Sequence, residues 1–248
     1  MTKAQDFPDD QALSALVEIE QKIFSETHIE IVDSLLFIKA KIYKEAERFE
    51  EALKTLNRIS NLSGSNLSAQ VLNEKIKNNY FIKNHVQAKN LILETTFLDG
   101  YQKTKEIILF ETLNYVALQE LDAAERSFFA LIADAEPVNE TFRKIKFKST
   151  EKAFVLSFII PGSGQIYAGH PLKGVLSLSI QAPLFYFGLN GIQRGYIFTE
   201  SIPSIALFQG FYFGGAEYAK ELVLQRNQRE VEELSLAILR KAKKEVSF

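Results

Sequence analysis

The chain of 248 residues has no cysteine, no tryptophan and only three histidines. Without cysteine it can form no disulfide and no thiolate nucleophile or metal ligand. The histidines, His28, His85 and His170, lie far apart and in no metal-binding spacing. A Gly-x-Ser-x-Gly element is also absent, and no carboxylate pair stands out from the surface charge. We therefore predict a protein that is not an enzyme and holds no metal and no cofactor.

Charge is also nearly balanced. The sequence has 29 Lys and Arg against 31 Asp and Glu, a net charge of -2, which gives no electrostatic argument for nucleic-acid binding. Hydrophobic residues make up 46% and charged residues 24%, so the chain is neither disordered nor composed mainly of membrane spans. It is long enough for one large domain or two smaller ones.

An internal repeat is present in the first half. Ala52, Ala88 and Ala124 are 36 residues apart, an apolar residue follows each alanine four positions later, and Ile59, Thr95 and Leu131 follow seven positions later. Such spacing predicts a pair of helices per repeat, with the small alanine where the two helices approach most closely. The positions nine residues before the alanines are Tyr43, Asn79 and Tyr115.

The segments 43–52 and 115–124 carry a family resemblance. Both resemble the core of a tetratricopeptide repeat, although the middle unit departs from the pattern with Asn79 and His85 in usually apolar places. The resemblance implies a helical-repeat solenoid over about 8–137, capped by an amphipathic helix over 12–24, which binds a protein partner. We interpret the lysines of the middle unit as a solvated helix face, with a carboxylate-binding clamp as the alternative. These lysines are Lys75, Lys77 and Lys83.

After the repeats the composition changes. A basic linker over 138–152 precedes an uncharged stretch, and two longer uncharged segments follow at 174–193 and 201–216. Each is near the minimum length for crossing a hydrocarbon core of about 30 Å. We therefore expect an all-α protein whose residues 153–218 form a transmembrane helical hairpin, followed by an amphipathic helix over 219–248.

Polar residues interrupt the two uncharged segments. They are costly against lipid unless they are paired, so the two helices should pack together and hide them. The spacing Gly210-x-x-x-Gly214 permits close approach of membrane helices, within the hairpin, in a membrane complex or in a homo-oligomer. The intramembrane polar candidates are Gln181, Asn190, Gln209 and Glu217.

A glycine-rich motif over 161–169 lies between the short uncharged stretch and the first long one. It lacks the Gly-Lys-Ser/Thr of a phosphate-binding loop, so we interpret it as a break between helices. It resembles the PGxGQxYxG signature of small bacterial membrane hairpin domains, which implies an architecture but no assigned activity. The residues that match the signature are Pro161, Gly162, Gly164, Gln165, Tyr167 and Gly169.

The sequence leaves three functions open. The first is a membrane-anchored scaffold whose repeats bind a protein partner, and the second is a transport or insertion component that uses the intramembrane polar residues. The third is a soluble helical-repeat protein. Lys and Arg flanking the hairpin place the repeats in the cytoplasm by the positive-inside rule. A removed signal peptide, indicated by the Lys-Ala-Gln step before acidic residues at the start, would place them in the periplasm.

Overall fold

The computed structural model describes residues 10–60, 66–97, 100–132, 142 and 145–243. In these residues the chain forms eleven α-helices and no β-strand, which confirms the all-α prediction. The chain divides into two compact units. Unit 1 comprises Met1–Asn139 with Ala237–Phe248, and unit 2 comprises Glu140–Leu236. The predicted boundary at 137 lies outside the described residues.

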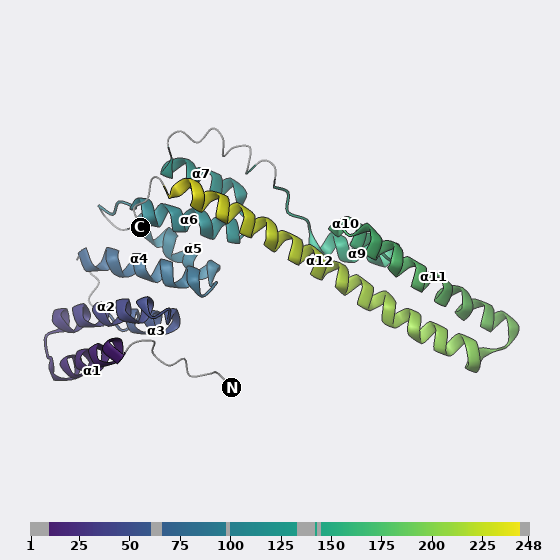
Figure 1. Cartoon of the computed structure of the whole chain (residues 1–248), viewed down its shortest axis with the longest axis horizontal. Helices are drawn as coiled ribbons and strands as arrows, with labels where there is room; N and C mark the ends of the chain where they lie inside the picture. Colours follow the sequence, from purple (N-terminus) through teal and green to yellow (C-terminus); the bar gives the residue numbers. More distant parts are fainter. Residues whose placement is uncertain (1–9, 61–65, 98–99, 133–141, 143–144, 244–248) are drawn as a thin grey trace. The chain divides into compact units, whose positions relative to one another are not determined.

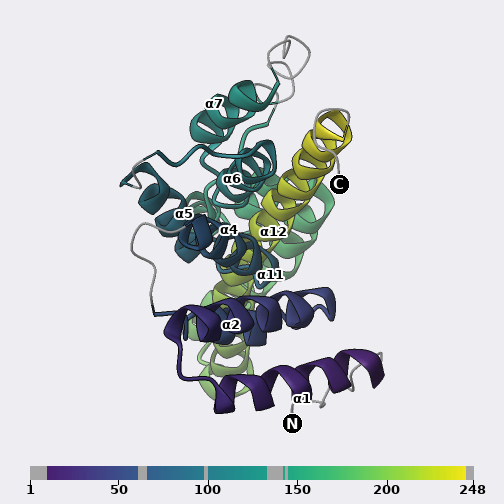
Figure 2. The ribbon, with the colours of Figure 1, turned by 90° about the vertical axis from the view of Figure 1, so that its left-hand side faces the viewer.

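Unit 1 contains consecutive helix pairs. Each helix packs against the next one along the chain, so the pairs follow one another in sequence order (Figure 1), and Figure 2 shows α1 and α2 as neighbours at one end of this unit. The elements are α1 (Asp10–Ser25), α2 (Ile29–Glu45), α3 (Phe49–Leu56), α4 (Asn66–Phe81), α5 (His85–Glu94), the 3-10 turn η1 (Thr95–Phe97), α6 (Lys105–Ala117) and α7 (Leu121–Leu131).

The three periodic alanines lie at equivalent places in this arrangement. Ala52, Ala88 and Ala124 belong to α3, α5 and α7, the second helix of each pair, and all three are completely buried. A larger side chain there would force the paired helices apart, because protein interiors are close-packed. The residues four positions later are also buried, as the spacing predicts. They are Leu56, Ile92 and Phe128.

The turns inside the pairs repeat as well. Glu47, Lys83 and Gln119 lie five positions before the three alanines, and their φ angles are 56°, 61° and 62°. After each of them, a backbone N–H reaches back five residues to a carbonyl oxygen. These bonds run from Arg48 to Tyr43, from Asn84 to Asn79 and from Glu120 to Tyr115, at 2.8, 2.9 and 2.9 Å. This left-handed helix ending normally favours glycine, and because polar residues occupy it here the turn could not be predicted from the sequence.

Unit 2 begins with two short helices and continues with two long ones. They are α9 (Thr150–Ile159), α10 (Ser163–Ala168), α11 (Pro171–Arg194), the π-helical turn η2 (Ile197–Ser201) and α12 (Ile202–Ala242). The predicted boundary between residues 218 and 219 falls inside α12, which continues without a break. The physical reason is that no glycine or proline lies between Ala216 and Ala242 to end the helix.

Candidate functional site

The glycine-rich motif forms the junction between α9, α10 and α11. Pro161 follows the end of α9, and Gly162 takes a φ of +91° to start α10. A Cβ on Gly162 would lie 2.1 Å from the carbonyl oxygen of Gly174, and one on Gly174 would lie 2.5 Å from the carbonyl oxygen of Gly162. The backbone of this turn therefore touches the backbone of α11, and only glycine fits at either place.

Gly164 lies close to both α9 and α12. A Cβ there would come within 2.1 Å of the Ala153 carbonyl oxygen, 2.2 Å of the Ser157 hydroxyl and 2.8 Å of Ala219. The Gly164 amide instead donates a hydrogen bond to the Ser157 hydroxyl at 3.2 Å. Ala153 and Ala219 are completely buried, so this position is the closest contact of three helices.

Gln165 connects α10 to two further helices. Its side chain is 1% exposed. Its amide nitrogen donates to the Gly215 carbonyl of α12 at 2.8 Å, and its amide oxygen accepts from the Ser157 hydroxyl of α9 at 3.3 Å. Both ends of the buried amide are therefore satisfied, which a buried polar group requires.

Tyr167 and Gly169 complete the junction. The Tyr167 hydroxyl accepts a hydrogen bond from the amide of Ser149, the residue that precedes α9, at 3.2 Å. Gly169 ends α10 with a φ of +100°, and a Cβ there would lie 3.3 Å from the guanidinium of Arg226. The five residues after Pro161 that match the signature thus each have a packing or hydrogen-bonding role inside unit 2.

The close contacts that α11 makes with η2 and α12 involve glycines other than the predicted pair. A Cβ on Gly188 would lie 2.9 Å from Ile205 of α12, and one on Gly191 would lie 2.6 Å from the Ser201 hydroxyl of η2. Among the described residues, no atom lies within 4 Å of a Cβ built on Gly210 or Gly214. Neither glycine therefore makes a close contact with α11, and the prediction that the pair joins helices in a membrane complex or a homo-oligomer stays a prediction.

The four polar candidates are not brought together. Gln181 is 2% exposed, and its amide nitrogen donates to the Ser177 hydroxyl at 2.7 Å. Asn190 is half-buried, whereas Gln209 and Glu217 are exposed. Glu217 pairs with Lys220 at 3.1 Å. Unit 2 therefore buries Gln181 fully and Asn190 partly, whereas Gln209 and Glu217 lie on its surface.

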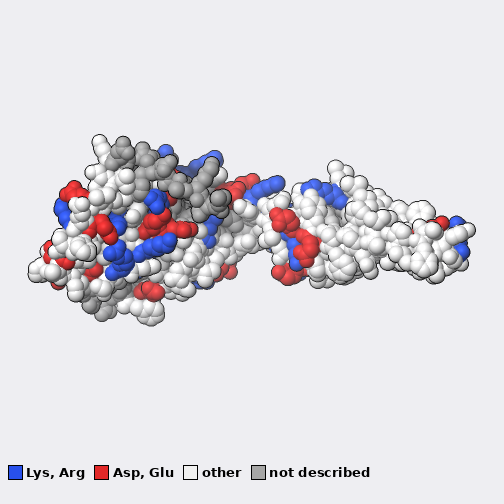
Figure 3. Space-filling view, turned by 90° about the horizontal axis from the view of Figure 1, so that it is seen from below, with Lys and Arg blue, Asp and Glu red and all other residues white. Residues whose placement is uncertain are grey.

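Large apolar side chains cover the outside of the hairpin. Among the described residues, one helix, α11, is long and apolar enough to cross a membrane, and only 17% of its most apolar window is buried. Figure 3 shows a stretch without charged residues between a charged band and a charged tip. The exposed large apolar residues of α11 are Leu172, Val175, Leu176, Leu178, Ile180, Phe185, Phe187, Leu189 and Ile192. Those of α12 before Gly214 are Ile202, Ile205, Leu207, Phe211 and Phe213.

A polar groove of about 530 Å³ lies between α3, α4 and α5 in unit 1. Burial lowers the pKa of Lys75 in this groove, and the nearby charge of Glu94 opposes that effect. Amide side chains supply both donors and acceptors along the groove, which suits the alternating groups of a peptide backbone. Its polar lining consists of Asn57, Lys75, Asn79, Asn84, Gln87 and Glu94.

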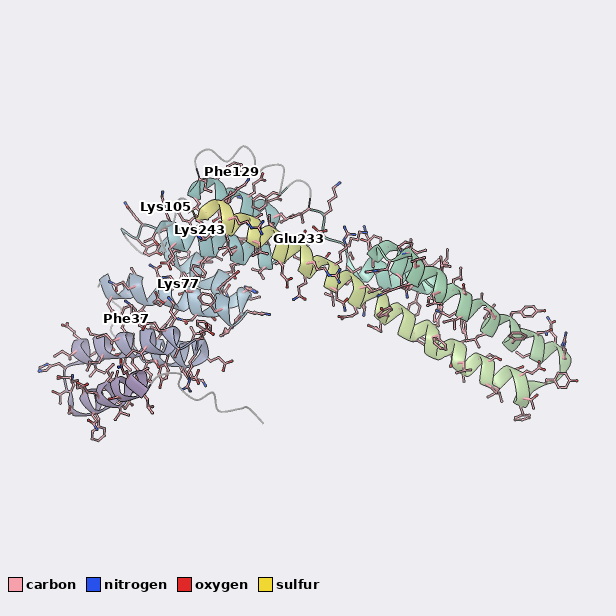
Figure 4. The ribbon with its side chains drawn as sticks, viewed as in Figure 1. Phe37, Lys77, Lys105, Phe129, Glu233 and Lys243 are labelled. Carbon is pink, nitrogen blue, oxygen red and sulfur yellow. The ribbon has the colours of Figure 1, made fainter. Side chains whose placement is uncertain are left out.

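The expectation that the lysines of the middle unit form a solvated helix face is wrong for Lys77. This residue of α4 (Figure 4) is 7% exposed, and its ammonium lies 3.0 Å from Glu74 and 2.7 Å from Glu106. Lys44 also reaches Glu74, at 2.8 Å. Burial alone would raise the pKa of Glu74, but the two lysines outweigh it and lower that pKa. Lys77 therefore links α4 to α6 and does not face solvent, whereas Lys83 is exposed.

Compared with known proteins, the chain matches no family model, no curated protein and no solved structure. The tetratricopeptide and hairpin resemblances therefore stay predictions that rest on the residues that carry them.

Proposed function

We propose that this protein is a non-enzymatic, membrane-anchored interaction scaffold. Unit 2 inserts α11 and the first half of α12 into a bacterial membrane, and unit 1 is a tetratricopeptide-like solenoid that binds a protein partner. The observation that carries the proposal is the exposed, uncharged apolar surface on both helices of the hairpin. Contiguous apolar patches of this kind are rare on soluble monomers and mark membrane or protein contacts.

The dimensions of the hairpin support insertion. The uncharged run 174–193 of α11 extends about 30 Å at about 1.5 Å per residue, which equals the thickness of a hydrocarbon core. The uncharged run 201–216 of α12 is shorter, at about 24 Å by the same rise. Apolar residues of the connecting turn, Tyr196, Ile197 and Phe198, are exposed and extend the apolar surface beyond the start of α12.

Charge at the two ends of the hairpin favours one orientation. Lys146, Lys148, Lys152 and Lys220 flank the end from which the chain enters and leaves, against Arg194 as the last residue of α11 at the opposite end. By the positive-inside rule this end faces the cytoplasm, and we propose that the repeats lie on that side of an inner membrane. Fusions to the C-terminus test the assignment. A reporter that works only in the cytoplasm should be active, and a reporter that works only in the periplasm should be inactive.

Membrane insertion is tested by flotation of the full-length protein with lipid vesicles. We expect Phe187→Asp to abolish flotation, because a carboxylate in a membrane-spanning helix costs about 3 kcal/mol. Phe187 is 53% exposed, so unit 2 itself should still fold. Leu172→Asp is the matched control, since Leu172 is 85% exposed but precedes the uncharged run. Equal flotation of both variants, or a wild-type protein that stays soluble, would reject insertion.

Partner binding is tested by purification from detergent-solubilised membranes. We expect Lys75→Glu to lose a protein that co-purifies with the wild type, because it reverses the one basic charge of the polar groove. Lys54→Glu is the control, because Lys54 is exposed on α3 and does not line the groove. Loss of the partner with both variants, or with neither, would contradict binding in this groove.

A further inference from the structure

A charged cavity of about 290 Å³ lies in unit 2, where the turn between α10 and α11 faces α12. One side is formed by Ala168, Gly169 and His170. The other side carries four charged residues of α12, two of each sign. They are Arg226, Arg229, Glu230 and Glu233, and Glu230 lies one helical turn after Arg226.

Arg226 has unused hydrogen-bonding capacity in this cavity. Its Nε is buried and has no hydrogen-bond partner among the described residues. Its terminal nitrogen lies 3.5 Å from Glu230, longer than the 2.7–2.9 Å typical of a charge-assisted hydrogen bond. The absence of a side chain at Gly169 leaves the space that the guanidinium occupies. The arginine is therefore held at the cavity without a full set of acceptors.

The cavity adjoins the start of the apolar hairpin. Gly169 and His170 precede α11, whose uncharged run begins at Gly174, about 6 Å further along at about 1.5 Å per residue. If α11 crosses the membrane as proposed, this cavity lies in the layer of phospholipid headgroups. His170 provides no side-chain cap for α11, so the first amide groups of that helix add donors near the same turn.

We propose that this cavity binds the headgroup of a zwitterionic phospholipid that carries a primary ammonium. The phosphate contacts Arg226 and Arg229, and the ammonium contacts Glu230 and Glu233 (Figure 4 labels Glu233). The two carboxylates oppose a purely anionic headgroup, and a quaternary ammonium has no N–H to donate to them. The proposal rests on the membrane insertion proposed above.

The test uses the full-length protein in phosphatidylcholine nanodiscs that contain phosphatidylethanolamine or phosphatidylglycerol, with the retained lipids measured by native mass spectrometry. We expect preferential retention of phosphatidylethanolamine. The double variant Arg226→Gln with Arg229→Gln should bind it about tenfold more weakly, the effect of one lost charge-assisted hydrogen bond. Arg240→Gln, in the same helix but outside the cavity, should bind it as the wild type does.

A second double variant makes an opposite prediction. Glu230→Gln with Glu233→Gln should shift the preference from phosphatidylethanolamine to phosphatidylglycerol, because only the two arginines remain charged. No wild-type preference, or a preference that neither double variant changes, overturns the headgroup site while insertion stands. If soluble glycerophosphoethanolamine displaces the lipid at equal concentration, the site binds the free headgroup compound as well as the lipid, and the proposal of a lipid ligand is overturned. A wild-type protein that enters no nanodisc rejects the proposed function itself.

Discussion

Gly162 and Gly174 meet backbone to backbone. Each would place a Cβ within 2.5 Å of the other's carbonyl oxygen, the closer approach being 2.1 Å. Gly162 also has a φ of +91°, so it needs glycine for two reasons, whereas Gly174 needs it for space alone. This contact joins the start of α10 to the first turns of α11 and fixes where the long helix begins.

Gly174→Ala should destabilise unit 2 by about 1–3 kcal/mol, because an added methyl group overpacks a contact made by backbone atoms that cannot move aside. Gly210→Ala is the matched control, since open space surrounds that position in the described structure. Thermal unfolding of both variants in detergent measures the difference. Equal stability of the two variants would show that the contact is not formed.

Gln165→Leu should cost about 1–3 kcal/mol, because it leaves the Gly215 carbonyl of α12 without its buried donor. Gln209→Leu, at an exposed position of α12, should leave stability almost unchanged. The free energy of unfolding in a denaturant series compares the two variants. A larger loss from Gln209→Leu would contradict the roles assigned to these glutamines.

Gln119→Gly should stabilise unit 1, because a residue with a side chain costs about 1–2 kcal/mol in the left-handed region and glycine does not. The larger conformational entropy that glycine loses on folding offsets part of this gain. Gln119→Val should destabilise it, since a β-branched residue is disfavoured at a φ of 62°. The exposed side chain makes these backbone effects separable from packing. Melting temperatures that move in the same direction for both variants would be inconsistent with this turn.

Stability should depend on His85 at mildly acidic pH. Burial, the largest influence, lowers the pKa of His85 in the folded protein, and nearby Lys83 lowers it further, although the hydrogen bond to Asn114 at 3.0 Å opposes them. Below about pH 6.5 the unfolded chain therefore binds the proton more readily than the folded one. The stabilising preference for neutral His85 is present above that pH and is lost as pH falls toward the lower, folded pKa.

His85→Gln should remove this dependence while keeping an amide donor toward Asn114. Urea unfolding between about pH 7 and 5 gives the free energies, with His28→Gln as the control that keeps the wild-type slope. The same slope in wild type and His85→Gln would assign the dependence to other groups.

The repeat could be recognised in the sequence because the space between the two helices of each pair admits only a small side chain, and an alanine occupies that position at 52, 88 and 124. Their complete burial agrees with that argument. The matching turns at Glu47, Lys83 and Gln119 could not be read, because ordinary polar residues occupy backbone positions where glycine would have been the signal. The burial of Lys77 was missed since its partner Glu106 lies on another helix of the unit.

By itself the sequence determined the helical class, the period of the repeat and the position of the uncharged segments, because these depend on local spacing and composition. Only the tertiary structure decided which glycines make close contacts. Gly210 and Gly214 have the expected spacing but open space around them, whereas Gly188 lies against α12 and Gly191 against η2. Side-chain spacing defines a helix face, but the neighbouring element that covers this face is set by packing of residues distant in the chain.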